Sequence, residues 1–528
     1  MPFHPRLDKR TDQAPPNAAP LPPLGVLVSN PAMICLPTPD AAIVERRVSI
    51  VRALRALVAP GNVIEDDLRL AAYETDALTA YRQRPLVVVL PETTAEVAAI
   101  LAFADREGVN VVPRGAGTSL SGGAIPAADA IVVALGKFNK IVDIDYANRC
   151  VVAQCGVTNL AISHAVAGEG FYYAPDPSSQ IACTIGGNVA ENSGGVHCLK
   201  YGLTTNNVLG VELVTPQGEI VRLGGKHLDA GHYDLLGLTV GSEGLIGIVT
   251  EVTVRILRRP QTARALLIGF QSIESAGACV AAIIGNGIIP AGMEMMDRPA
   301  IAAAEAFVNV GYPLDVEALL IVELDGPVVE VDYLIERVGA IAAQNAAAGI
   351  RVSTSERERL AFWAGRKAAF PAVGRLSPDY YCMDGTIPRR ELPRVLREID
   401  SMQARYGLRV ANVFHAGDGN LHPLILYDAN VPGEIDKAEA FGFEILKLCV
   451  DVGGVLTGEH GVGLEKRDLM TYQFGPIDLE VQHRVKHAFD PFVRFNPGKV
   501  FPTLRRCAEQ GREHVHSGAE RFAHLPRF

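Results

Sequence analysis

The sequence lacks the features by which several protein classes are recognised. No run of about 20 uninterrupted apolar residues, the length of a membrane-spanning helix, occurs in it, and the nearest, residues 276–293, is broken by Gly, Asn and Pro. The nine cysteines form no CxxC pair, and no secretory leader is recognisable, so reduced thiols in the cytoplasm are expected. Their spacing also argues against a ferredoxin-like iron–sulfur cluster in this chain.

An excess of basic residues is missing as well. The chain has 49 Lys and Arg against 59 Asp and Glu, and its formal charge is −10. This balance argues against a nucleic-acid-binding surface. A small anionic substrate would therefore need a local group of basic side chains.

The composition that is present predicts a packed protein of two or three domains. Hydrophobic residues make up 48% of the 528 residues and charged residues 20%. Prolines are dense in residues 1–40, which predicts a disordered tail. Near Pro260 small-residue loops give way to strands and alanine-rich helices, which predicts a domain boundary there. The expected organisation is a first domain over residues 41–260, a second over 261–505 and a tail over 506–528.

Residues 86–113 predict a strand, a helix and a second strand. Thr93 and Glu96 fit a capping box at the start of the helix. The second strand runs into a loop of small residues, 114–123, whose backbone N–H groups can approach an anion closely. The loop does not match the Rossmann fingerprint, because Leu120 replaces the third glycine and no crossover helix follows.

Two further small-residue stretches cover residues 175–179 and 184–195. One such loop alone fits an ordinary glycine-rich turn equally well. Several in one region instead predict a long cofactor, with its pyrophosphate near the first loop and its ring system near the second. Residues 241–248 add a further signal, although alone they indicate only a loop before a strand.

A predicted hairpin carries the first reactive side chains. Asp418 and Gly419 suit a two-residue turn, which would place His422 directly opposite His415 with Cβ atoms about 5 Å apart. Two neutral imidazoles at that separation can hold one divalent cation. The alternative is a tight hairpin that carries two polar residues and no cation.

A second motif, residues 458–463 (GEHGVG), completes the predicted centre. Glu459 is the expected third ligand of the cation, and His460 beside it is the expected base. Lys466 and Lys499 have two interpretations: cations that neutralise an anionic cofactor or phosphate, or, as the favoured account, solvated charges.

These motifs together resemble the FAD-linked oxidase family, whose flavin domain is of the vanillyl-alcohol oxidase type, and within it the flavin subunits of bacterial glycolate oxidases. The resemblance covers about residues 45–520. It depends on residues 113–118 (PRGAGT), 175–179 (PDPSS), 185–188 (IGGN), 241–244 (GSEG), 362–367 (FWAGRK), 415–422 (HAGDGNLH), 458–463 and 496–499 (NPGK).

The resemblance implies an α+β fold, in which a two-subdomain FAD-binding domain is followed by an antiparallel-sheet cap domain. Some relatives attach FAD through a histidine in the first loop; Thr118 stands near that position here, so non-covalent FAD is expected. The residues expected to bind FAD are Pro113, Arg114, Gly115, Ala116, Gly117, Thr118, Ser119, Pro177, Ser178, Thr184, Gly187, Asn188, Gly194, Gly195, Glu243, Ile248 and Asn496.

The expected reaction is oxidation of a short 2-hydroxy acid, glycolate, to the 2-oxo acid glyoxylate. Zn²⁺, with Mn²⁺ as the alternative, would bind the substrate hydroxyl, His460 would take its proton, and a hydride would pass to flavin N5. Arg366 and Arg375 are candidate clamps for the substrate carboxylate, and Arg366 is favoured. Relatives that oxidise larger diacids carry a lysine near Cys382, and its absence favours a monoacid.

Several alternatives stay open at this stage. D-lactate is the alternative substrate within the family, and a flavin-free metal-dependent hydrolase and a non-catalytic flavin subunit are the other two. The resemblance also implies a second FAD-binding subunit and an iron–sulfur subunit as partners. The expected location is the cytoplasm, with association at the inner membrane through those partners as an alternative.

Overall fold

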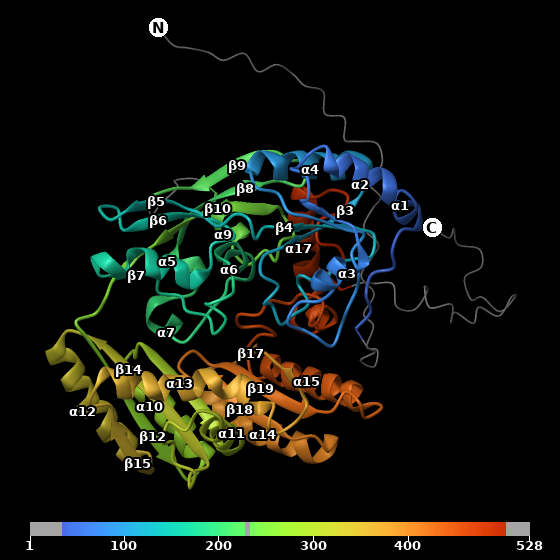
Figure 1. Ribbon diagram of the computed structural model, residues 1–528. Coiled ribbons are helices and arrows are strands. Elements are labelled where there is room, and N and C mark those ends of the chain that lie inside the picture. The colour runs from blue at the N-terminus through green and yellow to red at the C-terminus, as the bar shows by residue number, and fades with distance from the viewer. Residues whose placement is uncertain (1–33, 228–232, 503–528) are drawn as a thin grey trace, which may run out of the picture. The chain divides into compact units, whose positions relative to one another are not determined.

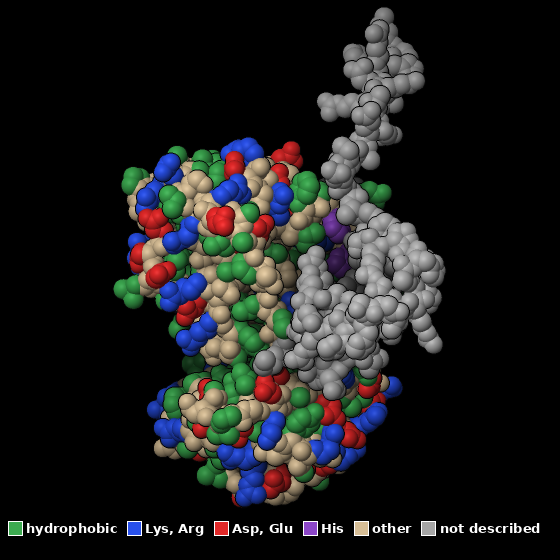
Figure 2. Space-filling model, turned by 90° about the vertical axis from the view of Figure 1, so that its right-hand side faces the viewer, with side chains coloured by type: hydrophobic (Ala, Val, Ile, Leu, Met, Phe, Trp, Pro, Cys, Tyr) green, Lys and Arg blue, Asp and Glu red, His purple; other side chains and the backbone are tan. Residues whose placement is uncertain are grey.

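A computed structural model describes residues 34–227 and 233–502 (Figure 1). Most of the predicted N-terminal tail and all of the predicted C-terminal tail lie outside these ranges. Among the described helices, none has the length and apolar character needed to cross a membrane. On the face shown in Figure 2, acidic and basic side chains are intermixed and do not gather into one basic surface.

The first sheet contains the predicted strand–helix–strand unit. Its helix, α4 (Thr94–Glu107), begins at a capping box in which the Thr93 side chain and Glu96 satisfy each other's backbone N–H groups, so that prediction is confirmed. Gly108 ends the helix in the left-handed conformation. Two strands run parallel to a central β4, and the order in the sheet is β1 (Val63–Ile64), β2 (Val87–Val89), β4 (Ala130–Ala134) and β3 (Asn110–Arg114).

The second sheet is antiparallel and has five strands. One apolar core joins it to the helices α5 (Asn159–Val166) and α6 (Ile185–Glu191). Helix α6 is formed by part of the small-residue stretch 184–195, with the Thr184 side chain as its N-cap. The strand order is β5 (Ile141–Asp145), β6 (Cys150–Gln154), β10 (Ile248–Arg255), β8 (Val208–Val214) and β9 (Ile220–Gly224).

A third, antiparallel sheet of eight strands begins after the boundary predicted near Pro260. Helices α11 (Arg298–Val308) and α13 (Glu356–Val373) share one core with its strands. The order is β15 (Ala347–Val352), β12 (Thr262–Phe270), β14 (Ala318–Gly326), β13 (Gly292–Asp297), β18 (Val410–His415), β19 (Asn420–Tyr427) and β16 (Asp379–Cys382), with β17 (Gly385–Thr386) also on β19. The predicted α+β class, with an antiparallel sheet after the first two, is confirmed.

The C-terminal part of the described chain returns to the first sheet. After α17 (Pro476–Phe489), Val111 N donates to Arg494 O at 2.9 Å, and Asn496 N donates to Val111 O at 2.7 Å. Phe495 is buried in the same apolar core as Val111. Residues near position 496 therefore lie beside the first small-residue loop, although 373 positions separate Asn496 from Gly123, whose carbonyl oxygen accepts a hydrogen bond from the Asn496 side chain.

Candidate active site

The hairpin of β18 and β19 differs from its prediction in the turn. His415 pairs with Asn420, and Val413 pairs with His422, so the loop contains the four residues 416–419. The predicted two-residue turn, with the two histidines directly opposed, is therefore wrong. The register is shifted by two residues, and because side chains alternate with a period of two, both imidazoles stay on one face as diagonal neighbours.

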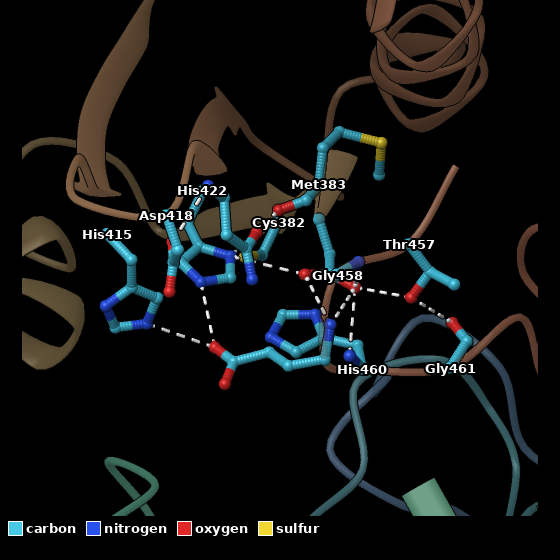
Figure 3. Close-up of polar contacts among 12 residues, drawn as sticks. Cys382, Met383, His415, Asp418, His422, Thr457, Gly458, His460 and Gly461 are labelled. Atoms are coloured by element: carbon cyan, nitrogen blue, oxygen red, sulfur yellow. Dashed lines mark hydrogen bonds and ion pairs between the residues drawn. The ribbon is translucent and has the colours of Figure 1, made fainter. Parts of the chain in front are cut away.

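This diagonal arrangement still brings the two imidazoles together. Their ring centroids lie 5.1 Å apart. Nε2 of His415 and Nε2 of His422 lie 3.1 and 3.0 Å from the same atom, Glu459 Oε1 (Figure 3). The structure thus brings the three predicted ligands together, with ligand atoms within 4.8 Å of one another.

Glu294 on β13 is a residue of this centre that sequence reasoning missed. Its Oε1 lies 2.7 Å from His415 Nδ1, and its Oε2 accepts a hydrogen bond from Arg366 Nε at 2.9 Å. Both Glu294 and Arg366 are about 1% exposed. The only signal in the sequence is an acidic residue inside the apolar run GMEMM. Glu294 therefore orients one predicted ligand and one predicted clamp at the same time.

The donor set fits a divalent cation. All four ring nitrogens of His415 and His422 face oxygen atoms, since His422 Nδ1 lies 3.3 Å from Met383 O. A neutral imidazole carries only one N–H, and donation from Nδ1 leaves each Nε2 with a lone pair. When both rings are neutral, two lone pairs and the carboxylate of Glu459 converge. Burial acts to lower the pKa of His415, but Glu294 and Glu459 raise it well above its ordinary value. A proton on His415 therefore supplies the positive charge that a bound cation would replace. A cation in that position matches ligands typical of Zn²⁺.

The chain around Glu459 is held by a second residue that was not predicted, Asp384. This carboxylate is fully buried and accepts hydrogen bonds from Thr457 Oγ1 at 2.5 Å and from the N–H groups of Gly458, Glu459 and His460 at 3.0, 3.2 and 2.9 Å. Its pKa is lowered: burial acts in the opposite direction, but the electrostatic attraction of His460, Lys466 and His422 for the ionised carboxylate prevails. Asp384 thus orients both the third ligand and the predicted base.

His460 has the protonation state that a base needs. Burial, with contributions from His422 and Lys466, lowers the pKa of His460 to about 4. Its imidazole is therefore neutral at pH 7 and retains a lone pair that can take a proton. By contrast, although burial opposes it, the two imidazoles hold the pKa of Glu459 well below its ordinary value, so that ligand is ionised.

One cavity joins this centre to the predicted cofactor loops. It is lined by Arg366 and Phe370 of α13, by His415 and His422 of the third sheet, and by Glu459 and His460 of the motif at residues 458–463. From the first two sheets and the C-terminal segment, the predicted cofactor residues that line it are Pro113, Arg114, Gly115, Ala116, Gly117, Thr118, Ser119, Pro177, Ser178, Thr184, Gly187, Asn188, Glu243, Ile248 and Asn496.

The first loop has the form of an anion cradle. Within residues 34–227 and 233–502, the backbone N–H groups of residues 115–118 donate to no protein acceptor. A Cβ at Gly115 would lie 2.5 Å from Thr184 Oγ1, and Gly117 has a φ of +71°. Glycine is therefore required where two loops approach each other closely, and the free N–H groups fit a pyrophosphate. These residues fit the FAD that the resemblance implies.

Two predicted cofactor residues lie behind the cavity wall. A Cβ at Gly194 would lie 2.5 Å from Glu459 Oε2, so this glycine lies against the third ligand. Gly195 has a φ of +155°, and a Cβ there would lie 2.5 Å from the backbone of Asp176. Neither lines the cavity. Gly194 instead makes room for Glu459, and Gly195 makes room for the backbone at Asp176 and Pro177; Glu459 and Pro177 do line the cavity.

The second predicted clamp, Arg375, is not brought to the site. Its side chain is exposed, donates to Ala306 O at 2.9 Å and lies over the ring of Phe307. It follows α13, whose preceding turns carry Arg366 into the cavity, and the helix ends before it. Of the two arginines, only Arg366 can therefore contact a substrate there.

The favoured interpretation of Lys466 and Lys499 as solvated charges is wrong. Lys466 is fully buried, with Nζ 2.9 Å from Glu465 Oε2 and 3.0 Å from Gly461 O. Lys499 is 3% exposed, and its Nζ donates to Ile125 O at 2.7 Å. Burial lowers the pKa of Lys499 to about 8. Both lysines bind backbone carbonyl groups of the loops that surround the cavity.

Glu243 joins the loop of residues 241–248 to the motif at residues 458–463. Its carboxylate accepts hydrogen bonds from Val462 N and Gly463 N, both at 2.7 Å. Glu243 itself has a positive φ of 50°, in the loop that precedes β10. The loop with the predicted base is thus tied to the loop that precedes the strand at Ile248.

Comparison with known proteins agrees with this arrangement. A family model described as FAD binding domain matches residues 85–224, and one described as FAD linked oxidases, C-terminal domain, matches residues 259–500. Glycolate oxidase subunit GlcD of Escherichia coli strain K12 is 55% identical over 482 residues, which cover 91% of this chain and 97% of that protein. D-lactate dehydrogenase of Anaerostipes hadrus is 32% identical over 453 residues, covering 84% and 95%.

A solved structure shares the fold. The crystal structure of p-cresol methylhydroxylase has a TM-score of 0.74, covers 89% of this chain and 99% of its own, and is 16% identical. This likeness and the two family models confirm the predicted two-domain FAD-binding fold. The relative from Escherichia coli matches this chain along 97% of its own length, and both family models match as well. The chain therefore belongs to the FAD-linked oxidase family.

Proposed function

We propose that the protein oxidises glycolate to glyoxylate with non-covalently bound FAD, as the catalytic subunit of a multi-subunit glycolate oxidase. The observation that carries this proposal is the single cavity whose wall combines the anion cradle with His415, His422, Glu459, His460 and Arg366. The relative with 55% identity, named as a glycolate oxidase subunit, supports the same substrate.

Three side chains would hold the cation. His415, His422 and Glu459 would ligate Zn²⁺ or Mn²⁺, which supplies a Lewis acid that favours loss of the hydroxyl proton. Glu294 keeps the His415 ring oriented through the 2.7 Å contact at Nδ1. The protein would thus contribute to the reaction by holding the cation ligands in a fixed orientation before the substrate binds.

The clamp and the base would complete the chemistry. Arg366 Nη2 is buried and, although it lies 2.7 Å from Glu294 Oε2, is not oriented to donate to it, so it has a hydrogen free for a substrate carboxylate. The neutral imidazole of His460 takes the hydroxyl proton. FAD supplies the acceptor for the hydride from the substrate Cα, so both electrons and both hydrogens of the alcohol are accounted for.

The substrate would be short. The ring of Phe370 lines the cavity beside His422, with centroids 6.3 Å apart, and it also contacts Tyr380. In the cavity wall, the apolar ring of Phe370 offers no charge to a second substrate carboxylate. A monoacid is therefore favoured, and D-lactate is the alternative, supported by the relative of that name.

The subunit would pass its electrons to partners. Because the relative is named a subunit, an assembly is expected, and we include a second FAD-binding subunit and an iron–sulfur subunit in the proposal. The proposed location of the protein is the cytoplasm. Such partners would also account for its association with the inner membrane. Copurification of tagged chain with partner subunits, and iron analysis of that complex, test this part.

The test of the reaction is anaerobic absorbance spectroscopy of the purified protein. Glycolate should bleach the oxidised-flavin band, and His460→Gln should slow bleaching by about 100-fold or more while FAD stays bound, because a general base contributes about 10²–10⁴. His164→Gln, in a helix away from the cavity, is the control. Faster bleaching by D-lactate would favour the alternative, and a protein that binds no FAD after reconstitution would refute the proposal.

A further inference from the structure

A second group of ligand atoms lies next to the proposed catalytic centre. Cys382 ends β16, which pairs with β19, the strand that carries His422. The Cys382 Sγ and His422 Nδ1 both lie near one carbonyl oxygen, that of Met383, at 3.4 and 3.3 Å. Cys382, His422 and His460 each offer one ligand atom, and these three atoms lie within 4.8 Å of one another (Figure 3).

The nitrogen Nδ1 of His460 provides an independent observation. It is buried and has no hydrogen-bond partner in the described part of the chain. The ring of His460 lies beside that of His422, with centroids 4.9 Å apart and planes inclined by only 13°. A buried ring nitrogen without a partner is costly unless it serves a ligand or a reaction, because it loses its hydrogen bond to water.

The chemistry of this group differs from that of the first. A thiolate and two imidazoles are a soft donor set that suits Zn²⁺ or Cd²⁺, whereas His415, His422 and Glu459 include no sulfur. Tetrahedral zinc with bonds of about 2.0–2.3 Å separates its ligands by about 3.3–3.8 Å. The three atoms would have to close by about 1 Å, which side-chain rotation can supply. The carbonyl oxygen of Met383 is adjacent as a fourth ligand.

We propose that Cys382, His422 and His460 form a second, inhibitory cation site, which binds a thiophilic divalent cation such as Zn²⁺ or Cd²⁺. On binding, the Cys382 thiol releases its proton to solvent and the thiolate ligates the cation. His422 belongs to both groups, so the two sites compete for it. His460 gives its lone pair to the cation and can no longer take a proton from substrate. The inhibition, but not the binding, rests on the proposed function.

The binding test uses the FAD-loaded protein, with its cysteine thiols reduced, and Cd²⁺ as the only added cation. Cadmium added in steps should produce a near-ultraviolet thiolate-to-cadmium charge-transfer band that saturates at one equivalent. Cys382→Ser should abolish the band and weaken Cd²⁺ binding by about 100-fold or more, since loss of outer-shell partners alone costs about 10- to 100-fold. Cys382→Ala provides a second variant in case the serine hydroxyl disturbs the buried site.

Two control variants locate the cation. Cys449→Ser changes another fully buried thiol and should keep the band, and His415→Ala removes a ligand of the first group only and should also keep it. A band that persists in both Cys382 variants, or no band in the unmodified protein, would overturn the proposal. Flavin absorbance of each variant verifies that it has folded.

The inhibition test uses glycolate turnover. Submicromolar to micromolar Cd²⁺ should inhibit the unmodified protein, and the inhibition constant of Cys382→Ser, measured against its own uninhibited rate, should rise by the same factor as the binding constant. Equal inhibition of both proteins would overturn the inhibitory role. A protein that shows the cadmium band but does not oxidise glycolate would refute the proposed function and leave the cation site standing.

Discussion

Replacing Glu294 with Gln is the sharpest test of how the centre is built. Glu294 has two buried partners, with Oε1 2.7 Å from His415 Nδ1 and Oε2 2.7–2.9 Å from Arg366. The glutamine has the same shape but only one acceptor oxygen, and its NH₂ group must face one of two donors. One hydrogen bond is then lost, and the guanidinium of Arg366 stays buried without a counter-charge.

The expected loss of stability is large. Breaking a buried ion pair by removing one partner costs about 3–5 kcal/mol, and the side chains of Arg366 and Glu294 are 2% and 1% exposed, so water screens little of it. For a unit of roughly 150–250 residues this lowers the unfolding midpoint by roughly 6–20 °C, which differential scanning fluorimetry measures. Cation affinity, measured by chelator competition, should also fall by about 10- to 100-fold, because His415 loses its orienting partner.

A matched variant gives the control. Glu439 is also buried, at 4% exposure, but one of its oxygens has no partner, and it makes no ion pair within the described chain. Glu439→Gln should therefore leave the midpoint unchanged or raise it at pH 8. A fall of less than about 2 °C in Glu294→Gln, or equal falls in both variants, would refute the reasoning that the charge pair with Arg366 matters.

Three further predictions address pH, the cofactor and the loop. Burial, and to a smaller extent Glu465, raises the pKa of Glu439 from 4.5 to about 7. The stability that this carboxyl group contributes is therefore complete below pH 4.5 and is lost as the pH rises through 7. The free energy of unfolding of Glu439→Gln, measured with urea, should exceed that of the unmodified protein by up to about 3 kcal/mol at pH 8 and should not differ near pH 4. Gly115→Ala should weaken FAD binding at least about tenfold in fluorescence titrations because its Cβ collides with Thr184, whereas Gly136→Ala, with open space, should not. Asp384→Asn should lower kcat for glycolate by about 10²-fold with FAD affinity unchanged, because it releases the loop that carries the ligand and the base; unchanged kcat would contradict that role.

Local signals in the sequence were sufficient for the strand–helix–strand unit of residues 86–113 and for most of the motifs. The capping box at Thr93 depends on residues three positions apart, and it formed as predicted. The pairing of β18 with β19 also follows from a short segment, although Asp418 and Gly419 suggested a two-residue loop where the structure has four residues. That error did not separate His415 from His422, because a shift of two residues preserves the face of a strand.

Partners that come from distant parts of the chain could not be predicted in this way. Glu294 meets His415 across 121 residues, and Asp384 meets His460 across 76. The resemblance favoured Arg366, but no local physical signal distinguishes it from Arg375. The end of α13 leaves Arg366 buried and Arg375 exposed.

The sequence by itself determined which residue types are present, the strand–helix–strand unit of residues 86–113, and the small-residue loops and the histidine pair that suggested an anion and a cation site. The tertiary structure alone decided which charges are buried together, such as Arg366 with Glu294, and that Lys466 and Lys499 lie inside. The physical reason is range: capping, turn and period effects act over a few residues, whereas burial and charge pairing depend on chain packing between segments far apart in sequence.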